Sequence, residues 1–174
     1  TKPAQAVTQL ATIPFPTKTE DLHHEVELVV FIKSECANID PSEASSHIFG
    51  YAVGVDLTKR DLQSAAKEAS KPWDLSKGFH NSAPISKIIK KEGFLLNEGS
   101  ISLDVNGQNR QSSNISKMIW KVDELISWLS KFITLKAGDI IFTGTPAGVG
   151  KLVPNDKIDA EIENVGKLSF ELTK

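Results

Sequence analysis

The stretch that decides the fold covers residues 23–32 and reads His-His-Glu-Val-Glu-Leu-Val-Val-Phe-Ile. Its apolar, β-branched character predicts a buried strand. Residues i and i+2 of a strand point to the same face, so Glu25 and Glu27 project side by side, and Val29 continues that face. Two half-buried carboxylates repel each other and stay ionised together only if they share a cation or water reaches them. The pair indicates a divalent cation held by oxygen ligands; the alternative is a strand edge whose glutamates face water.

Composition excludes several classes of protein. The chain has 174 residues, 40% hydrophobic and 24% charged, which fits one domain that buries roughly 70% of the surface of its unfolded chain. The net charge of −2 and the absence of a basic run argue against nucleic acid as a partner. No apolar run approaches the length of a membrane span. A single cysteine, Cys36, allows no intrachain disulfide and favours a reducing compartment, so we expect a cytoplasmic protein.

Outward from the first strand, expected at 22–33, strands dominate and only a few short helices interrupt them. Asn106-Gly107 is a strong hairpin signal after the strand at 100–105. The first 21 residues, with three prolines, are expected to be an irregular lead-in. This order favours an α+β fold over a regular βαβ series. Further strands are expected at 49–57, 139–143, 157–163 and 168–172, and helices from Asp40, at 58–69 with Thr58 as cap, and at 117–132.

A second group of polar residues follows the strand at 49–57. Asp56 ends this strand, and the helix that opens after it offers unpaired N–H groups to an anion. Arg60 and Gln63 are three residues apart and share a helical face, so they can grip a carboxylate. The alternative reading is a solvated helix face with Asp56 as a plain helix cap.

Two irregular stretches carry further candidates. Lys77 lies between predicted elements, where beside a metal it can stabilise negative charge or act as a base; the alternative is a solvated lysine. Residues 142–150 contain three glycines and a proline after a strand, and this loop lets backbone and hydroxyl groups approach a ligand. The loop is not a phosphate-binding P-loop, because it lacks the Gly-Lys-Ser/Thr ending. Its alternative reading is a tight turn.

Together these stretches resemble one known family, the fumarylacetoacetate hydrolase family, and within it the small acylpyruvate hydrolase and oxaloacetate-acting branch. The resemblance runs in order from about residue 2 to 172, and its last block is the most specific. The matching blocks are His-His-Glu-Val-Glu-Leu at 23–28, Gly-Val-Asp-Leu-Thr-Lys-Arg-Asp-Leu-Gln at 54–63, Lys-Gly-Phe at 77–79, Val-Asn-Gly at 105–107 with Arg110-Gln111, and Gly-Asp-Ile-Ile-Phe-Thr-Gly-Thr-Pro-Ala-Gly-Val-Gly at 138–150.

The resemblance implies a mixed β-roll with short flanking helices, residues 1–174 forming one catalytic domain, and usually a homodimer. It implies that Mg²⁺ or Mn²⁺ is held by three carboxylates and that a catalytic lysine also contacts the substrate. Further groups hold the carboxylate of a 2-oxo acid. By position, the metal ligands are Glu25, Glu27 and Asp56, the lysine is Lys77, and the other substrate-binding residues are Arg60, Gln63 and Thr145.

The branch hydrolyses C–C bonds of acylpyruvates, decarboxylates oxaloacetate or shifts its keto–enol balance. Hydrolysis relies on a His and a Glu on a lid segment ahead of the match to Lys2-Pro3, and that segment is absent from the sequence. Residues 112–115 also depart from the family's Gly-x-Thr pattern. We expect the working protein to extend ahead of Thr1 by a segment that carries this His and Glu, and we therefore expect a C–C hydrolase. The alternative is an oxaloacetate decarboxylase or tautomerase and the third reading is a non-catalytic 2-oxo acid binder; a protein that truly lacks the segment would favour one of these two. In a eukaryote the location would be mitochondrial.

Overall fold

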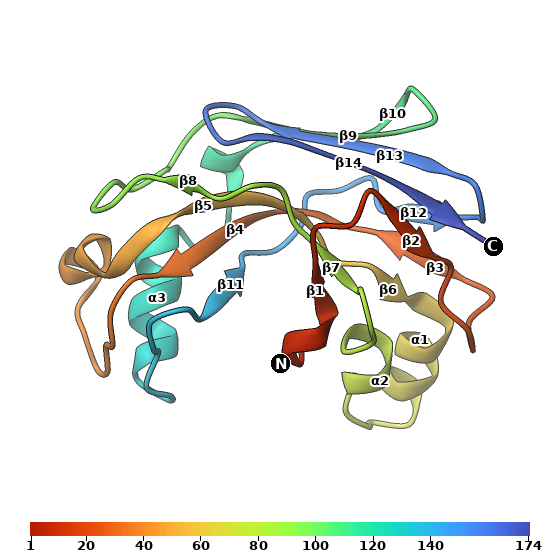
Figure 1. Cartoon of the computed structure of the whole chain (residues 1–174). Coiled ribbons are helices and arrows are strands. Elements are labelled where there is room, and N and C mark those ends of the chain that lie inside the picture. The colour runs from red at the N-terminus through yellow and green to blue at the C-terminus, as the bar shows by residue number, and fades with distance from the viewer.

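Two β-sheets form the body of the protein. The computed structural model describes residues 1–174 (Figure 1). A five-stranded sheet lies over a four-stranded sheet. In order across the first sheet the strands are β10 (Gln108–Asn114), β9 (Ser100–Val105), β13 (Lys157–Ile162), β14 (Gly166–Thr173) and β2 (Thr12–Pro14). Across the second they are β11 (Ile140–Phe142), β4 (Val26–Ile32), β5 (Ile48–Val55) and β8 (Ile89–Lys90).

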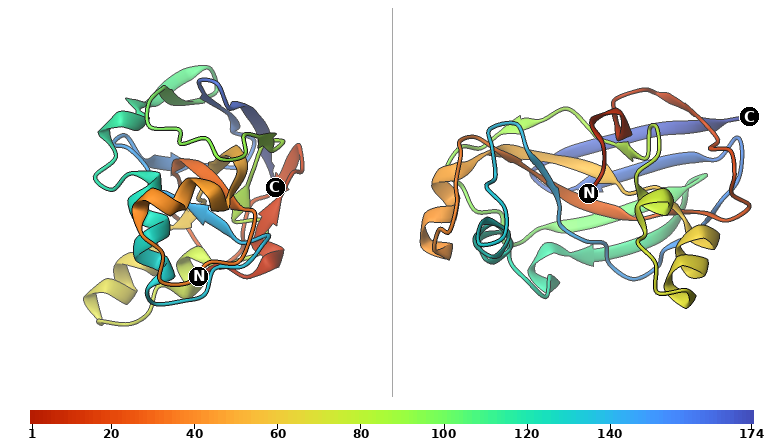
Figure 2. Two further views of the ribbon diagram at one scale, coloured as in Figure 1. Left: turned by 90° about the vertical axis from the view of Figure 1, so that its left-hand side faces the viewer. Right: turned by 90° about the horizontal axis from the view of Figure 1, so that it is seen from below.

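Smaller sheets and short helices complete the chain. β14 pairs with β2 in parallel and with β13 antiparallel, so the sheet is mixed, as expected for an α+β roll. In Figure 1, and from below in Figure 2, α3 lies towards one end of the four-stranded sheet and α1 with α2 towards the other. The remaining strands are β12 (Gly150–Leu152), β3 (Leu22–His24) and β6 (Thr58–Lys59) in one sheet and β1 (Val7–Thr8) with β7 (Ala83–Pro84) in another. The helices are α1 (Arg60–Glu68), α2 (Asp74–Lys77) and α3 (Val122–Ser130), with 3₁₀ turns η1 (Ala4–Ala6), η2 (Pro41–His47) and η3 (Ile115–Lys117).

The main core lies between the two large sheets, and β4 is buried on both faces. Leu28 and Val30 belong to the main cluster of 31 buried residues. Val29 and Phe31 belong to a separate cluster of four on the opposite face. The predicted alternation of β4 is therefore confirmed, and its charged end is as buried as its apolar end.

Several predicted boundaries were wrong where distant pairing decides the backbone. The strand expected at 22–33 is interrupted at Glu25, because β3 pairs with β12 and β6 whereas β4 pairs with β5 and β11. Thr58 does not cap a helix, because it lies in β6, where it pairs with His23 of β3, and α1 begins only at Arg60. The helix expected at 117–132 is α3 alone, preceded by η3.

The lead-in is also more ordered than predicted. It contains η1, β1 and β2, and β2 forms the edge of the five-stranded sheet. The hairpin prediction is confirmed, with positive φ angles of 52° at Asn106 and 74° at Gly107 between β9 and β10. The helix start at Asp40 is confirmed for η2, where the backbone N–H of Asp40 donates to Glu43 Oε2 at 3.0 Å. None of the helices has the length and apolarity that crossing a membrane requires.

Candidate metal and carboxylate site

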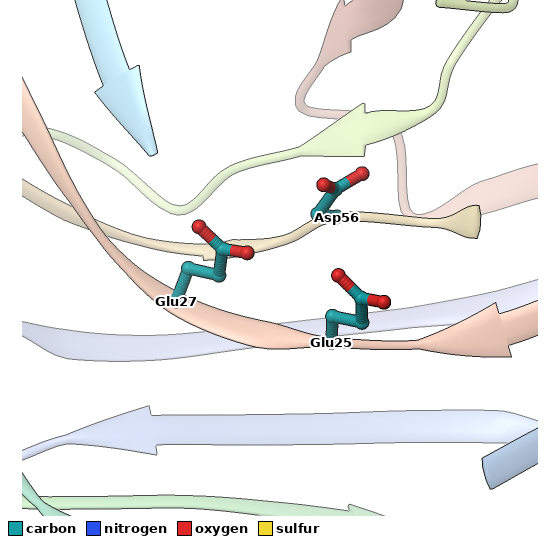
Figure 3. A group of neighbouring side chains, drawn as sticks. All are labelled: Glu25, Glu27 and Asp56. Carbon is teal, nitrogen blue, oxygen red and sulfur yellow. The ribbon is translucent and has the colours of Figure 1, made fainter. Parts of the chain in front are cut away.

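Three buried carboxylates meet at the junction of β3, β4 and β5. Glu25 sits at the strand break, Glu27 lies in β4, and Asp56 follows the end of β5. The backbone N–H of Asp56 donates to the Glu25 carbonyl at 2.8 Å, which holds the two segments together. One oxygen from each side chain lies within 4.8 Å of the others, and Figure 3 shows the three carboxyl groups gathered together. We call Glu25, Glu27 and Asp56 the carboxylate triad; the sequence predicted all three members.

The two glutamates of the triad differ in their electrostatic surroundings. Burial, together with the charge of Asp56, raises the pKa of Glu27 to about 8. Its one hydrogen bond comes from the backbone N–H of Gly144 at 2.7 Å. Burial also raises the pKa of Glu25, but hydrogen bonds and charges from Lys77 and Arg60 outweigh burial, so the pKa lies below its usual value. Glu25 is therefore ionised without a metal, whereas Glu27 needs another positive charge to ionise near neutral pH.

Lys77, at the end of α2, lies between two members of the triad. Its ammonium donates to Glu25 Oε2 at 2.7 Å, to Asp56 Oδ2 at 2.8 Å and to Thr58 Oγ1 at 2.7 Å. Burial lowers the pKa of Lys77, but the two carboxylates more than compensate, so the pKa lies above its usual value. The lysine predicted from the sequence is thus in the site and fully protonated.

A second lysine reaches the triad and was missed. Lys2 Nζ lies 2.8 Å from Asp56 Oδ1, in a partly buried ion pair. The same ammonium donates to Ser82 Oγ at 3.0 Å and to the carbonyl of Lys77. Burial lowers its pKa, although the Asp56 charge opposes this effect. No local pattern could reveal Lys2, since the pairing of β1 with β7 brings it here.

Arg60 and Gln63 share one face of α1, as predicted. Arg60 Nη1 donates to Gln63 Oε1, and Nη2 donates to Glu25 Oε1, both at 2.5 Å. The guanidinium therefore borders the triad at Glu25, whereas Lys2 reaches it at Asp56. The interpretation of these two residues as a solvated helix face is wrong, because Gln63 is buried and Arg60 is largely so.

The glycine-rich loop after β11 closes another side of the site. Thr143 donates to the Leu28 carbonyl through its backbone at 3.2 Å and its hydroxyl at 3.0 Å, which places Gly144 against Glu27. Thr145 follows, with its hydroxyl 2.8 Å from Gln111 Nε2. At Gly148, with φ +100°, an added Cβ would lie 2.2 Å from a backbone oxygen of β10, so only glycine fits there.

The residues around the triad fit a hard divalent cation. Carboxylate oxygens are the ligands that Mg²⁺ and Mn²⁺ prefer. Asp56 is buried beside Lys2 and Lys77, and Glu27 stays protonated near neutral pH unless positive charge is added. Three acidic side chains face Lys2, Lys77 and Arg60, so the fully ionised cluster is close to neutral before a metal binds.

A β-roll carrying a buried acidic triad, a lysine and an arginine defines a class of metal-dependent enzyme domain. The family model for the fumarylacetoacetate (FAA) hydrolase C-terminal domain matches residues 1–173. The chain belongs to the fumarylacetoacetate hydrolase family.

The named relatives include fumarylpyruvate hydrolases and oxaloacetate tautomerases. A fumarylpyruvate hydrolase from Ralstonia sp is 41% identical over 168 residues, which cover 97% of this chain and 88% of the relative. The mitochondrial oxaloacetate tautomerase FAHD1 of Homo sapiens is 40% identical over 163 residues, or 93% of this chain and 74% of the relative. The crystal structure of fumarylpyruvate hydrolase from Pseudomonas aeruginosa in complex with Mn²⁺ and pyruvate superposes with a TM-score of 0.96 at 38% identity, covering 99% of this chain and 76% of that one.

Proposed function

We propose that this protein is a Mg²⁺- or Mn²⁺-dependent hydrolase that cleaves C–C bonds in acylpyruvate-type 2-oxo acids. The observation that carries the proposal is the carboxylate triad, buried and bordered by Lys77 and Arg60. The fumarylpyruvate hydrolases among its relatives support the reaction, and the Mn²⁺ and pyruvate complex of one of them supports the metal and the ligand class.

In this proposal the triad holds the metal through one oxygen from each carboxylate. When bound, the metal supplies Lewis-acid polarisation of the substrate's keto oxygen. Glu27 would hold the metal in its ionised form, because the metal would supply the positive charge that this carboxyl lacks. Arg60 orients Glu25 through their hydrogen bond.

The remaining side chains act on the 2-oxo acid. Arg60 and Gln63 bind its carboxylate, and Thr145 contributes a hydroxyl. Lys77 is the catalytic group: its ammonium, which donates to Glu25 and Asp56, would stabilise the negative charge of the pyruvate enolate formed as the C–C bond breaks. Hydrolysis also needs a base that takes a proton from water. The family resemblance assigns this task to a His and a Glu ahead of Lys2.

The second candidate is an oxaloacetate decarboxylase or keto–enol tautomerase, which requires no water nucleophile. The observation that favours it is the 40% identity to the human oxaloacetate tautomerase. Charge stabilisation by Lys77 serves both reactions, because both pass through an enolate or enol. A non-catalytic 2-oxo acid binder would keep the same contacts without turnover.

Turnover of fumarylpyruvate, acetylpyruvate and oxaloacetate in the presence of Mn²⁺ separates these candidates. Hydrolysis of either acylpyruvate supports the proposal, conversion of oxaloacetate alone supports the second candidate, and binding without turnover supports the third. Lys77→Met should abolish turnover, whereas Lys87→Met, a change at an exposed lysine, should not. Equal activity of the two variants would remove Lys77 from the reaction.

We also propose a homodimer. An exposed apolar surface lies on α3 and immediately before and after it, formed by Ile119 (95% exposed), Trp120 (47%), Trp128 (46%) and Phe132 (70%). The Trp128 ring contacts the other two aromatic rings, with centroids 6.0 Å from Trp120 and 4.7 Å from Phe132. Contiguous apolar surface of this kind marks an association site. Light scattering after size exclusion should give twice the 19.0 kDa chain mass, and Phe132→Lys should shift it towards one copy.

For the location we propose the cytoplasm, or mitochondria in a eukaryote. The single cysteine, Cys36, is buried and free, which agrees with a reducing compartment. The human and rice tautomerase relatives carry the word mitochondrial in their names. Cell fractionation with an antibody to the protein tests both locations.

A further inference from the structure

Gln111 in β10 is fully buried and uses every polar atom of its side chain on the surroundings of the triad. Its Oε1 lies 2.9 Å from His24 Nδ1 and accepts from the backbone N–H of Val26 at 3.1 Å. Its Nε2 donates to Thr145 Oγ1 at 2.8 Å and to the Pro146 carbonyl at 3.0 Å. Buried amides that satisfy all their hydrogen bonds are rigid.

The chemistry of the partners fixes the orientation of this amide. The Val26 backbone nitrogen can only donate, so the oxygen of Gln111 must face it, and the Pro146 carbonyl can only accept, so the amide nitrogen must face the loop. His24 therefore donates from Nδ1 to the same oxygen.

Each end of Gln111 holds a different wall of the site. The oxygen binds the residues on both sides of Glu25, where the chain leaves β3 and enters β4 and ladder pairing stops. The nitrogen binds the glycine-rich loop at Thr145, next to Gly144, whose N–H donates to Glu27. One side chain thus joins two walls, of which the first lies 85 to 87 residues and the second 34 to 35 residues from Gln111 in the sequence.

The contact also determines what the Thr145 hydroxyl does. Because Thr145 Oγ1 accepts from Gln111 Nε2, its own proton points elsewhere, and it donates to no protein atom. Thr145 is partly exposed, so this proton is available to a ligand. A freely rotating hydroxyl would present a lone pair as often as a proton.

We propose that Gln111 is a positioning residue that makes the Thr145 hydroxyl a fixed donor to the carboxylate of the bound 2-oxo acid. The inference rests on the proposed function, in which Thr145 contacts that carboxylate. Gln111 itself touches no substrate. Its amide nitrogen therefore acts on ligand affinity through the Thr145 hydroxyl, whereas its amide oxygen holds the segment around Glu25.

A double-mutant cycle on oxalate binding tests this dependence. Oxalate is a planar dianion that resembles the pyruvate enolate, and calorimetry with Mn²⁺ at saturation measures its affinity. Gln111→Glu keeps both accepting contacts and loses both donating ones. We expect it to weaken oxalate at least tenfold in the wild-type background and less than threefold in Thr145→Val. Thr145→Ser, which keeps the hydroxyl, should restore the full effect of Gln111→Glu.

Two further variants keep the test decisive. Gln111→Met is neutral but also loses the contacts to His24 and Val26, so it should weaken oxalate in both backgrounds and more strongly where the Thr145 hydroxyl is present. This result removes the added charge as an explanation, and the variant replaces Gln111→Glu if that one does not fold. Gln108→Glu adds a charge at an exposed glutamine on the same strand and should leave oxalate affinity unchanged. Equal losses of affinity with and without the Thr145 hydroxyl would overturn the role of Gln111 alone. Failure of the wild-type protein to bind oxalate with Mn²⁺ would overturn the proposed function as well.

Discussion

Replacement of Glu27 by glutamine should change two measurable properties: the pH dependence of stability in the metal-free protein, and the affinity for the metal. Burial and the Asp56 charge raise the pKa of Glu27 from 4.5 to about 8. Between these two pH values the folded protein carries a proton on Glu27 that the unfolded chain lacks. The stabilisation from this proton is complete below pH 4.5 and is lost as the pH rises through 8.

The size of the effect follows from the same shift. Each pH unit between the two pKa values corresponds to about 1.36 kcal/mol, so the metal-free wild type should lose about 3 kcal/mol of unfolding free energy through Glu27 between about pH 6 and 9. For a chain of this length the loss lowers Tm by roughly 5 to 10 °C. Glutamine does not titrate, so Glu27→Gln should lack this part of the pH dependence.

The same variant should bind metal poorly. Loss of a side chain that hydrogen-bonds to a metal ligand typically lowers metal affinity about 10- to 100-fold. Loss of a ligand itself should therefore lower metal affinity at least about 100-fold, or by roughly 2.7 kcal/mol. At a Mn²⁺ concentration about 100 times the wild-type Kd, the wild type gains about 2.7 kcal/mol of stability and Glu27→Gln gains well under 1 kcal/mol.

Thermal unfolding from pH 6 to 9, with and without Mn²⁺, measures both effects, and calorimetry gives the affinities directly. Glu171→Gln, at an exposed glutamate of β14, is the matched control and should follow the wild type throughout. If Glu27→Gln has the wild-type pH dependence and the wild-type increase of Tm with Mn²⁺, the placement of Glu27 in the metal site is wrong.

Three further substitutions test the charge balance of the site, the glycine-rich loop and the core. Lys2→Met removes a cation 2.8 Å from Asp56, so the affinity for Mn²⁺ should rise and the affinity for oxalate should fall, each roughly tenfold. Calorimetry measures both affinities, and a fall in both would contradict this prediction. Gly148→Ala places a Cβ 2.2 Å from a backbone oxygen at φ +100°, and should lower the unfolding free energy by about 2 kcal/mol or more in urea; an unchanged midpoint would argue against this loop geometry. The Tyr51 hydroxyl donates to the Phe94 carbonyl at 2.6 Å and accepts from the backbone N–H of Leu96 at 3.2 Å. Tyr51→Phe should therefore lower the unfolding free energy by about 1 to 3 kcal/mol in the same urea assay. An unchanged unfolding free energy would mean that these buried groups find other partners.

The sequence was sufficient for the parts of the site that local spacing controls. Glu25 and Glu27 are two residues apart on a strand, and Arg60 and Gln63 are three apart on a helix, so periodicity alone places each pair on one face. The hairpin at Asn106-Gly107 follows from the dihedral preferences of those two residues. The family resemblance added the connection between these local groups.

Contacts that depend on distant pairing could not be predicted. Lys2 reaches Asp56 only because β1 pairs with β7, and nothing in the first residues reveals that partner. Gln111 reads as an ordinary polar residue of an exposed strand, and its burial follows from the packing of the glycine-rich loop on β10. Thr58 is of a residue type that often caps helices, but its pairing with β3 and a hydrogen bond from Lys77 determine its conformation.

The charge balance of the site predicts a dianionic 2-oxo acid as its ligand, before any contact with the acyl group is considered. Three carboxylates face three cationic side chains, so the fully ionised cluster has no net charge, and a divalent metal brings it to +2. Unbalanced charge in a buried site is costly, and a dianion restores neutrality. Oxaloacetate and fumarylpyruvate each carry two carboxylates, and the pyruvate enolate produced in either reaction is itself a dianion. The substrate and the enolate formed from it thus carry the charge that balances the metal-loaded site. The difference in oxalate affinity with and without Mn²⁺ measures how much this charge balance contributes to binding.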